Sequence, residues 1–289
     1  ATGRPDAVSP RSDPGGSARL MTNHICTTCG NQHVSGEQPP ARCAICEDER
    51  QWVRHAGQAW TTLAELARSH TNVFNTLEPG LTEIVTQPKF AIGQGALLVQ
   101  TPDGNVLWDC VSLIDDATII AVEALGGIAS LAMSHPHMYA SMVVWSHAFG
   151  DAPIYLHAAN QRWVMRHDPV IEFWQGESLC LAQGVSLHRC GGHFTGSTVL
   201  HWPAGAEGRG VLLSSDTLHV TQDRKYVSFM YSFPNYVPLS MPAIEGVVGT
   251  VAPLEFDRIY SHFSGLVIER DAKSVIARSV ERYKRAISS

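Results

Sequence analysis

Two histidines separated by one residue, His135 and His137, follow directly after the short apolar segment 128–133. In an extended backbone, residues i and i+2 point to the same side, so both imidazoles can face one ion. A third histidine, His193, follows two glycines, and Asp216 comes at the end of another apolar segment. Three neutral imidazoles and a carboxylate are a normal ligand set for Zn²⁺ or non-haem iron. These four residues predict a metal site, and they require a fold that brings distant loops together.

Strand-like and helix-like segments alternate from residue 90 onward. Short apolar runs of the strand type are found at residues 96–100, 105–109, 128–133, 153–157, 185–189, 198–202 and 211–214. Helix-like segments are found at residues 117–125, 242–252 and 271–287. This alternation predicts an α/β domain in which helices cover packed sheets.

The order of these motifs resembles the metallo-β-lactamase superfamily. A His-x-His motif after a strand is followed about 55 residues later by Gly-His-x-x-Gly-Ser, and then by a strand that ends in an aspartate. An earlier strand that ends in Asp109 also matches, so the resemblance covers residues 90–265. It implies an αββα sandwich with the metals at the edge where these loops meet. By this resemblance, His135, His137 and His193 occupy the first metal position, and Asp216 occupies the position that bridges two metals.

The chain departs from the family motif at the second metal position. The family motif is His-x-His-x-Asp-His, but this chain has Tyr139 and Ala140 where the family has Asp and His. A phenol with a pKa near 10 binds Zn²⁺ poorly at neutral pH, and alanine offers no ligand atom. We therefore expect a mononuclear site, with His262 near the position of the last histidine of the second site. Tyr139 is interpreted as a hydrogen-bond donor to a developing oxyanion.

Four cysteines near the start of the chain form a second candidate metal site. Cys26 and Cys29 form one Cys-x-x-Cys pair, Cys43 and Cys46 form another, and thirteen residues separate the pairs. Each pair can hold two thiolates around one tetrahedral ion, and two pairs complete a closed shell. The spacing predicts a zinc-ribbon-like or rubredoxin-like knuckle that holds Zn²⁺ or iron. A closed site has no open ligand position, so its role is structural.

Composition divides the chain into three regions. Residues 1–20 are rich in Pro, Gly, Ser and Arg, and we expect a disordered leader. Residues 21–58 form the predicted four-cysteine module, and residues 59–289 the predicted catalytic domain. The paired Cys motifs favour thiols and metal over disulfides, and the first twenty residues contain no apolar signal-peptide segment, so we expect a cytoplasmic protein.

Charge and hydropathy narrow the choice of partners. The net charge of −6 and the absence of a basic stripe argue against nucleic acid, since binding to phosphates needs a concentrated cationic surface. No apolar run reaches the roughly 18–20 residues that span a bilayer. We therefore expect a small-molecule substrate. Trp52 and Trp60 follow the cysteine pairs, so the module can dock either on its own catalytic domain or on a neighbouring subunit. A homodimer is therefore one of the open alternatives.

The predicted function is that of a metal-dependent hydrolase. We expect metal-activated water at the mononuclear site to cleave an acyl bond of a small molecule, which includes esters, lactones, thioesters and amides. Asp216 either binds the metal or holds the attacking water. Two alternatives remain from the sequence: a mononuclear non-haem iron oxidoreductase or dioxygenase of the same fold, and a non-catalytic ligand-binding member whose second metal site is degenerate.

Overall fold

The computed structural model describes residues 21–182 and 184–287, and within this part most strands form two large sheets. The first sheet has the order β3 (Thr71–Glu78), β4 (Leu81–Gln87), β5 (Gly95–Val99), β6 (Val106–Trp108), β7 (Ser130–Ala132), β8 (Ile154–His157), β9 (Ile171–Trp174). The second has the order β10 (Ser178–Ala182), β11 (Val185–Arg189), β12 (Thr198–Trp202), β13 (Val211–Leu213), β18 (Arg258–Tyr260), β19 (Val267–Ile268). The predicted leader, residues 1–20, lies outside the described residues.

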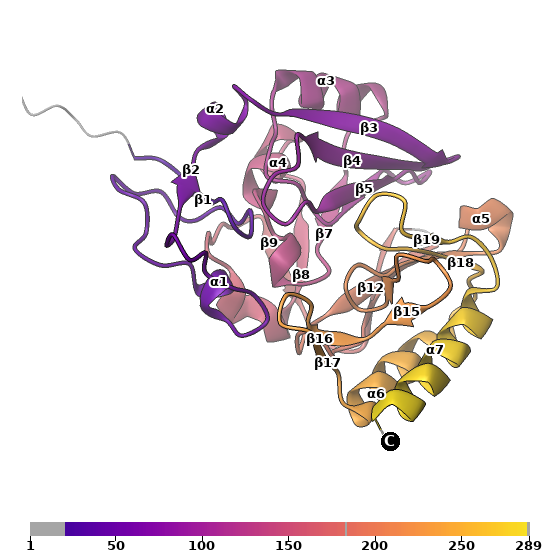
Figure 1. Ribbon diagram of the computed structural model, residues 1–289. Helices are drawn as coiled ribbons and strands as arrows, with labels where there is room; N and C mark the ends of the chain where they lie inside the picture. Colours follow the sequence, from indigo (N-terminus) through magenta and orange to yellow (C-terminus); the bar gives the residue numbers. More distant parts are fainter. Residues whose placement is uncertain (1–20, 183, 288–289) are drawn as a thin grey trace, which may run out of the picture.

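The two sheets pack face to face, with helices on both outer sides (Figure 1). Leu97 and Val99 on β5 face the second sheet and pack with Leu200 and Leu213, while the alternate residues of β5 face the other way. This alternation follows from the two-residue period of a strand, and it requires a buried residue at every position of β5. The predicted αββα sandwich is therefore confirmed.

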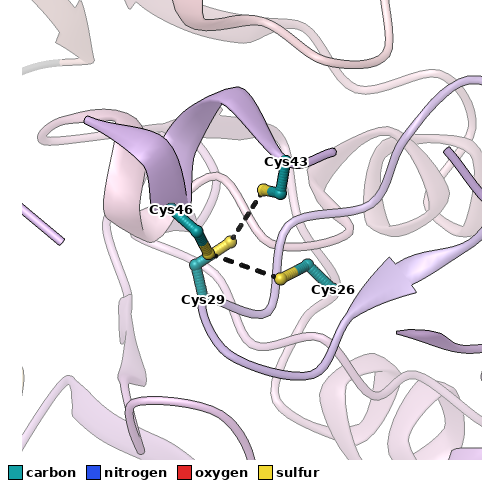
Figure 2. Close-up of side chains that lie close together, drawn as sticks. All are labelled: Cys26, Cys29, Cys43 and Cys46. Carbon is teal, nitrogen blue, oxygen red and sulfur yellow. Dashed lines mark hydrogen bonds between the residues drawn. The ribbon is translucent and has the colours of Figure 1, made fainter. Parts of the chain in front are cut away.

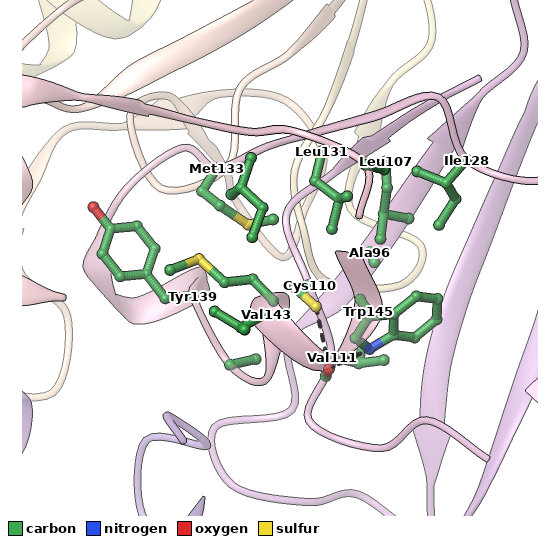
Figure 3. Packing of buried hydrophobic residues seen from close by; sticks show 14 of the residues in the cluster. Ala96, Leu107, Cys110, Val111, Ile128, Leu131, Met133, Tyr139, Val143 and Trp145 are labelled. Carbon is green, nitrogen blue, oxygen red and sulfur yellow. Dashed lines mark hydrogen bonds between the residues drawn. The ribbon is translucent and has the colours of Figure 1, made fainter. Parts of the chain in front are cut away.

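The outer face of the first sheet is covered by α3 (Asp116–Ala124) and α4 (Met142–Ala148), whose Val122 and Trp145 lie in one apolar cluster with that sheet. Figure 3 shows part of this cluster. The outer face of the second sheet is covered by α6 (Met241–Val251) and α7 (Ala272–Ile287), through residues such as Val247 and Val275. The Asp115 side chain caps α3 by accepting a hydrogen bond from the Thr118 backbone.

The three helices predicted from the sequence are present. The predicted segments 117–125, 242–252 and 271–287 correspond to α3, α6 and α7 within one residue at either end. A capping box formed by Thr62 and Glu65 starts a further helix, α2 (Leu63–Leu66), which is only one turn long. In the described part of the chain, no helix is long and apolar enough to cross a membrane.

Short elements connect and surround the sandwich. Two small hairpins, β14 (His219–Val220) with β15 (Val227–Ser228) and β16 (Met230–Ser232) with β17 (Val237–Pro238), lie between β13 and α6, and the short α5 (Gly205–Gly208) joins β12 to β13. The four-cysteine segment contains β1 (Ile25–Cys26) and α1 (Ala44–Glu47) and lies at one side of the sandwich (Figure 1). Strand β1 pairs with β2 (Trp60–Thr61), which lies beyond residue 58, and the domain boundary there stays a prediction.

Candidate metal centre

The four predicted ligands come from loops at one edge of the sandwich. His135 follows β7 and His137 lies in a 3-10 turn, Pro136–Met138, while His193 lies in the turn between β11 and β12. Asp216 follows β13, which is parallel to β18, and His262 follows β18. Because the carboxyl ends of parallel neighbours meet at the same edge, residues that follow these strands lie close together.

The structure brings the predicted ligand atoms within reach of one ion. One ligand atom each from His135, His137, His193 and Asp216 lies within 4.8 Å of all the others. Asp216 Oδ2 is 3.3 Å from His135 Nε2 and 3.9 Å from His193 Nε2. All four residues are at most 6% exposed. This is the tetrad that the sequence predicts.

Hydrogen bonds on the far side of two imidazoles fix their orientation. Met230 O accepts from His193 Nδ1 at 3.1 Å, so His193 Nε2 carries the lone pair that faces the cluster. Ser134 Oγ lies 2.8 Å from His135 Nδ1 and itself donates to Ser215 Oγ, so it accepts from the imidazole. Both rings therefore turn their Nε2 toward the site.

Unpartnered buried atoms show that the site fits a cation. His135 Nε2, His137 Nε2 and Asp216 Oδ1 are buried and have no hydrogen-bond partner in the described structure. Buried polar atoms without a partner are rare in native proteins and cost free energy. Burial lowers the pKa of His193 to about 3 and that of His137 well below its ordinary value, which keeps both imidazoles neutral as metal ligands. A divalent cation bound by this tetrad would satisfy the two unpartnered histidine nitrogens, whereas Asp216 Oδ1 faces His219 and His262.

A second cluster shares Asp216 with the first. Nδ1 of His219 and Nδ1 of His262 each lie 3.5 Å from Asp216 Oδ1, and these three residues also form a possible ligand set. The sequence predicts His262 near the second metal position. The signal in the sequence for His219 is its spacing of three residues after Asp216. Asp216 therefore points one oxygen at each cluster.

Tyr139 does not join either cluster. Its side chain is 2% exposed and lies in the apolar cluster with Val143 and Trp145 on α4 (Figure 3). Burial raises the pKa of its phenol above the ordinary value. Ala140, which follows it, has a left-handed backbone with φ of 42°. The catalytic role expected for Tyr139 stays a prediction, and no contact in the described structure supports it.

The four cysteines converge on one point (Figure 2). Cys26 Sγ lies 3.5 Å from Cys46 Sγ, and Cys29 Sγ lies 3.7 Å from Cys43 Sγ. Disulfide sulfurs lie about 2.05 Å apart, whereas four thiolates about 2.3 Å from one ion lie ~3.8 Å from each other. All four residues are at most 1% exposed. The cluster therefore has the dimensions of a tetrahedral metal site, and its ribbon class and metal identity stay predictions.

A cavity of about 430 Å³ opens onto the histidine site. Its floor contains His137, Asp216 and His219. Its walls are Arg50, Gln51, Trp52, Lys89, Ala91, Ile92, Phe233, Pro234 and Phe263. The first three wall residues belong to the four-cysteine module (residues 21–58), which therefore forms part of the cavity.

Acid is expected to destabilise the protein when its histidine site is free of metal. Burial lowers the pKa of His193 and of His262 to about 3, while in the unfolded chain each keeps a pKa near 6.5. Between pH 6.5 and 3 the unfolded state binds more protons, so the free energy of unfolding falls as the pH falls through this range. Each histidine contributes a slope of up to about 1.4 kcal/mol per pH unit.

Denaturant unfolding between pH 7 and pH 4 measures this slope. A His262→Gln variant, which cannot titrate at this position, is expected to show a shallower pH dependence than the wild type. Equal slopes for the two proteins would contradict the assignment of a buried neutral imidazole to His262.

No family model matches the chain. Among solved structures, the metallo-β-lactamase DIM-1 has a TM-score of 0.55 at 10% sequence identity and aligns with 74% of this chain and 98% of its own. VMB-1 has a TM-score of 0.54 at 13% identity, covering 75% and 98%. The metallo-β-lactamase FIM-1 from Pseudomonas aeruginosa, in its mono-zinc form, has a TM-score of 0.51 at 16% identity, covering 73% and 96%.

A closer relative is found among curated sequences. The uncharacterized protein YmaE of Bacillus subtilis (strain 168) is 47% identical over 272 residues, which are 93% of this chain and 98% of YmaE. Identity at this level over nearly the whole of both proteins establishes common descent, while the solved structures establish the fold. The chain has the metallo-β-lactamase fold and belongs to the same family as YmaE.

Proposed function

We propose that the protein is a metal-dependent hydrolase that cleaves an acyl bond of a small molecule. The observation that carries this proposal is the convergence of three imidazoles and Asp216, with unpartnered buried atoms, on the floor of a cavity. A relic of a metal site has no physical reason to keep these atoms buried and oriented. The hydrogen bonds to His135 Nδ1 and His193 Nδ1 orient two rings toward the same point.

The residues divide the chemistry among them. When bound, Zn²⁺ lowers the pKa of a coordinated water to about 7 and polarises a carbonyl oxygen. His135, His137 and His193 supply neutral nitrogen ligands, which leave the cation its full charge. Although burial favours the protonated form of Asp216, the surrounding imidazoles hold its pKa well below the ordinary value, so it stays a carboxylate. Its Oδ1, which faces His219 and His262, is placed to accept a proton from water.

The cavity favours a small substrate with an apolar body. Six of the nine wall residues are apolar, and the largest of them are Trp52, Phe233 and Phe263. The cavity volume of about 430 Å³ lies in the usual range for small-molecule sites. Lys89 supplies a cation at the same wall. Apolar walls with a few polar groups next to a metal site are typical of pockets that bind small acyl compounds. Esters, lactones, thioesters and amides remain the proposed substrate classes.

Zinc is the proposed metal at both sites. At the histidine site the neutral nitrogen ligands and the single carboxylate suit Zn²⁺ and also non-haem iron. We retain a single metal bound by His135, His137, His193 and Asp216 as the minimal active form. The cluster of Asp216, His219 and His262 supplies a ligand set for a second one. A cytoplasmic location and a homodimer stay proposals from the sequence.

A substrate panel on the purified, metal-analysed protein tests the function. We expect hydrolysis of at least one class among ester, lactone, thioester and amide substrates, and loss of that activity in His193→Ala. Bound iron together with consumption of O₂ would indicate an iron oxidoreductase and would contradict the hydrolase function. No turnover of any substrate by metal-loaded wild type would instead favour a ligand-binding protein.

A further inference from the structure

The four-cysteine module contacts the loops that carry the metal ligands. Asn31 Nδ2 donates to Pro136 O at 3.2 Å, between the two histidines of the His-Pro-His segment, and also lies 3.6 Å from Cys29 Sγ. The backbone N–H of Gln32 donates to Ala140 O at 2.9 Å. The segment between the two cysteine pairs is therefore attached directly to the loop that holds His135 and His137.

Arg50 makes a second attachment, to the loop of His193. Its Nη1 donates to His193 O at 3.1 Å, and its guanidinium carbon lies 3.8 Å from the centre of the Phe194 ring. The other two nitrogens bind both carboxylate oxygens of Asp48, with Nη2 2.8 Å from Oδ2. The side chain is nine-tenths buried, so all three nitrogens act inside the protein.

Phe194 extends this contact to the whole histidine triad. Its ring centre lies 5.7 Å from that of His135 and 5.0 Å from those of His137 and His193. Phe194 is 1% exposed and its ring lies against all three histidine rings. Arg50 therefore contacts both the backbone of His193 and the Phe194 ring, against which the three histidine rings pack.

A short covalent path joins Arg50 to the thiolate cluster. Helix α1 begins after Cys43, contains Cys46 and ends at Glu47, with Asp48 as its C-cap. The Asp48 carboxylate accepts from the Arg50 backbone N–H at 3.0 Å, and Asp48 O accepts from Gln51 N at 2.9 Å. Only three residues, 47–49, thus separate Cys46 of the cluster from Arg50. When the four thiolates hold α1 in place, the positions of Asp48 and Arg50 are fixed as well.

We propose that Arg50 is a positioning residue of the histidine metal centre, through which the four-cysteine module sets the affinity of that centre for metal. The geometry explains why an arginine stands here. The planar guanidinium group of arginine can bind a carboxylate with two nitrogens and donate to a carbonyl with the third. It can stack on an aromatic ring at the same time, whereas the ammonium group of lysine has no plane with which to do so. Asp48 neutralises the cation, so it can lie close to a bound metal.

The proposal concerns metal binding and rests on the proposed function only in requiring that the histidine centre holds a metal. Titration of the full-length protein with Co²⁺ separates the two sites, because only the cysteine cluster gives intense thiolate-to-cobalt absorption. We expect Arg50→Met to bind metal at the histidine centre about 10–100-fold more weakly than the wild type, with the thiolate absorption unchanged. Arg50→Lys should recover only part of the loss.

Arg54→Met is the matched control. Arg54 lies in the same module and also donates to a backbone carbonyl, that of Thr27, but its contact is exposed and remote from the histidines. It should leave both titrations unchanged. Asp48→Asn is a variant with a smaller structural change, since it keeps the side-chain shape while weakening the hydrogen bonds to Arg50. We expect it to lower the affinity of the histidine centre for metal by an intermediate amount.

Two results would overturn the proposal. One is an affinity of the histidine centre within about twofold of wild type in both Arg50→Met and Asp48→Asn, with the thiolate absorption intact. The other is an equal loss in Arg54→Met, which would indicate a general effect of the module. Neither outcome depends on hydrolysis, so a failure of the proposed hydrolase activity can be distinguished from a failure of the role proposed for Arg50.

Discussion

Replacing His135 with alanine is expected to remove one equivalent of metal per chain and to lower hydrolytic turnover by more than about 100-fold. Changes to residues that merely orient a ligand cost roughly 10–100-fold, and removal of a ligand atom should exceed this range. His135 Nε2 lies closest to the shared carboxylate, 3.3 Å from Asp216 Oδ2. Elemental analysis of the variant beside wild type measures the loss.

The metal count also separates one metal from two at the histidine site. Two equivalents in wild type correspond to one ion at the cysteines and one at the histidines, while three would place an additional ion at Asp216, His219 and His262. His188→Ala is a suitable control, because His188 is a half-buried histidine on β11 whose side chain contacts Ser186. Unchanged metal content in His135→Ala would contradict the assigned ligand set.

Replacing Cys43 with serine is expected to have the largest effect on stability. A four-thiolate Zn²⁺ site contributes roughly 10–16 kcal/mol of apparent binding free energy at neutral pH, and the module has little other core. Its buried apolar cluster consists mainly of the four cysteines and Ile45, with Trp60 and Trp163 at its edge. Without the metal, residues 22–61 should lose their fixed structure.

Hydrogen exchange followed by mass spectrometry measures this effect segment by segment. In Cys43→Ser, peptides from residues 22–61 should exchange much faster than in wild type, while peptides from β5 and β12 keep their protection. Cys180→Ser changes an exposed thiol on β10 and should leave the pattern unchanged. Full protection of residues 22–61 in Cys43→Ser would show that the module folds without its metal.

Much of the fold was predictable because its strands carry closely spaced apolar residues. The predicted segments 185–189 and 198–202 coincide with β11 and β12. Strand β12 is buried along its whole length, whereas β11 alternates and buries only Val185 and Leu187. The hairpin of β3 and β4 was not identified, since β3 is half-exposed and carries Thr and Asn between its apolar residues. Edge strands of this kind differ little from loops in composition.

The site was predictable where a ligand directly follows a strand and not where a loop decides its direction. His219 reaches the centre because Ser215 has a left-handed backbone with φ of 48°, which turns the chain sharply after β13. Tyr139 is adjacent to the ligands in sequence, but it ends a 3-10 turn that begins after His135. With about three residues per turn, a residue two positions after His137 points to another side.

The long-range attachments of the module determine the order in which the chain can assemble during its synthesis. Asn31 and Arg50 contact partners that lie 105 and 143 residues later in the chain, and Asn235 Nδ2 binds Glu49 O across 186 residues. The four cysteines all lie within the first 46 residues, so they leave the ribosome long before these partners exist. Thiolate metal uptake can therefore precede docking, whereas the Asp216–His219–His262 cluster cannot be completed until His262 has emerged. The finished module therefore presents its docking residues, among them Asn31 and Arg50, before the loops that they bind have been synthesised.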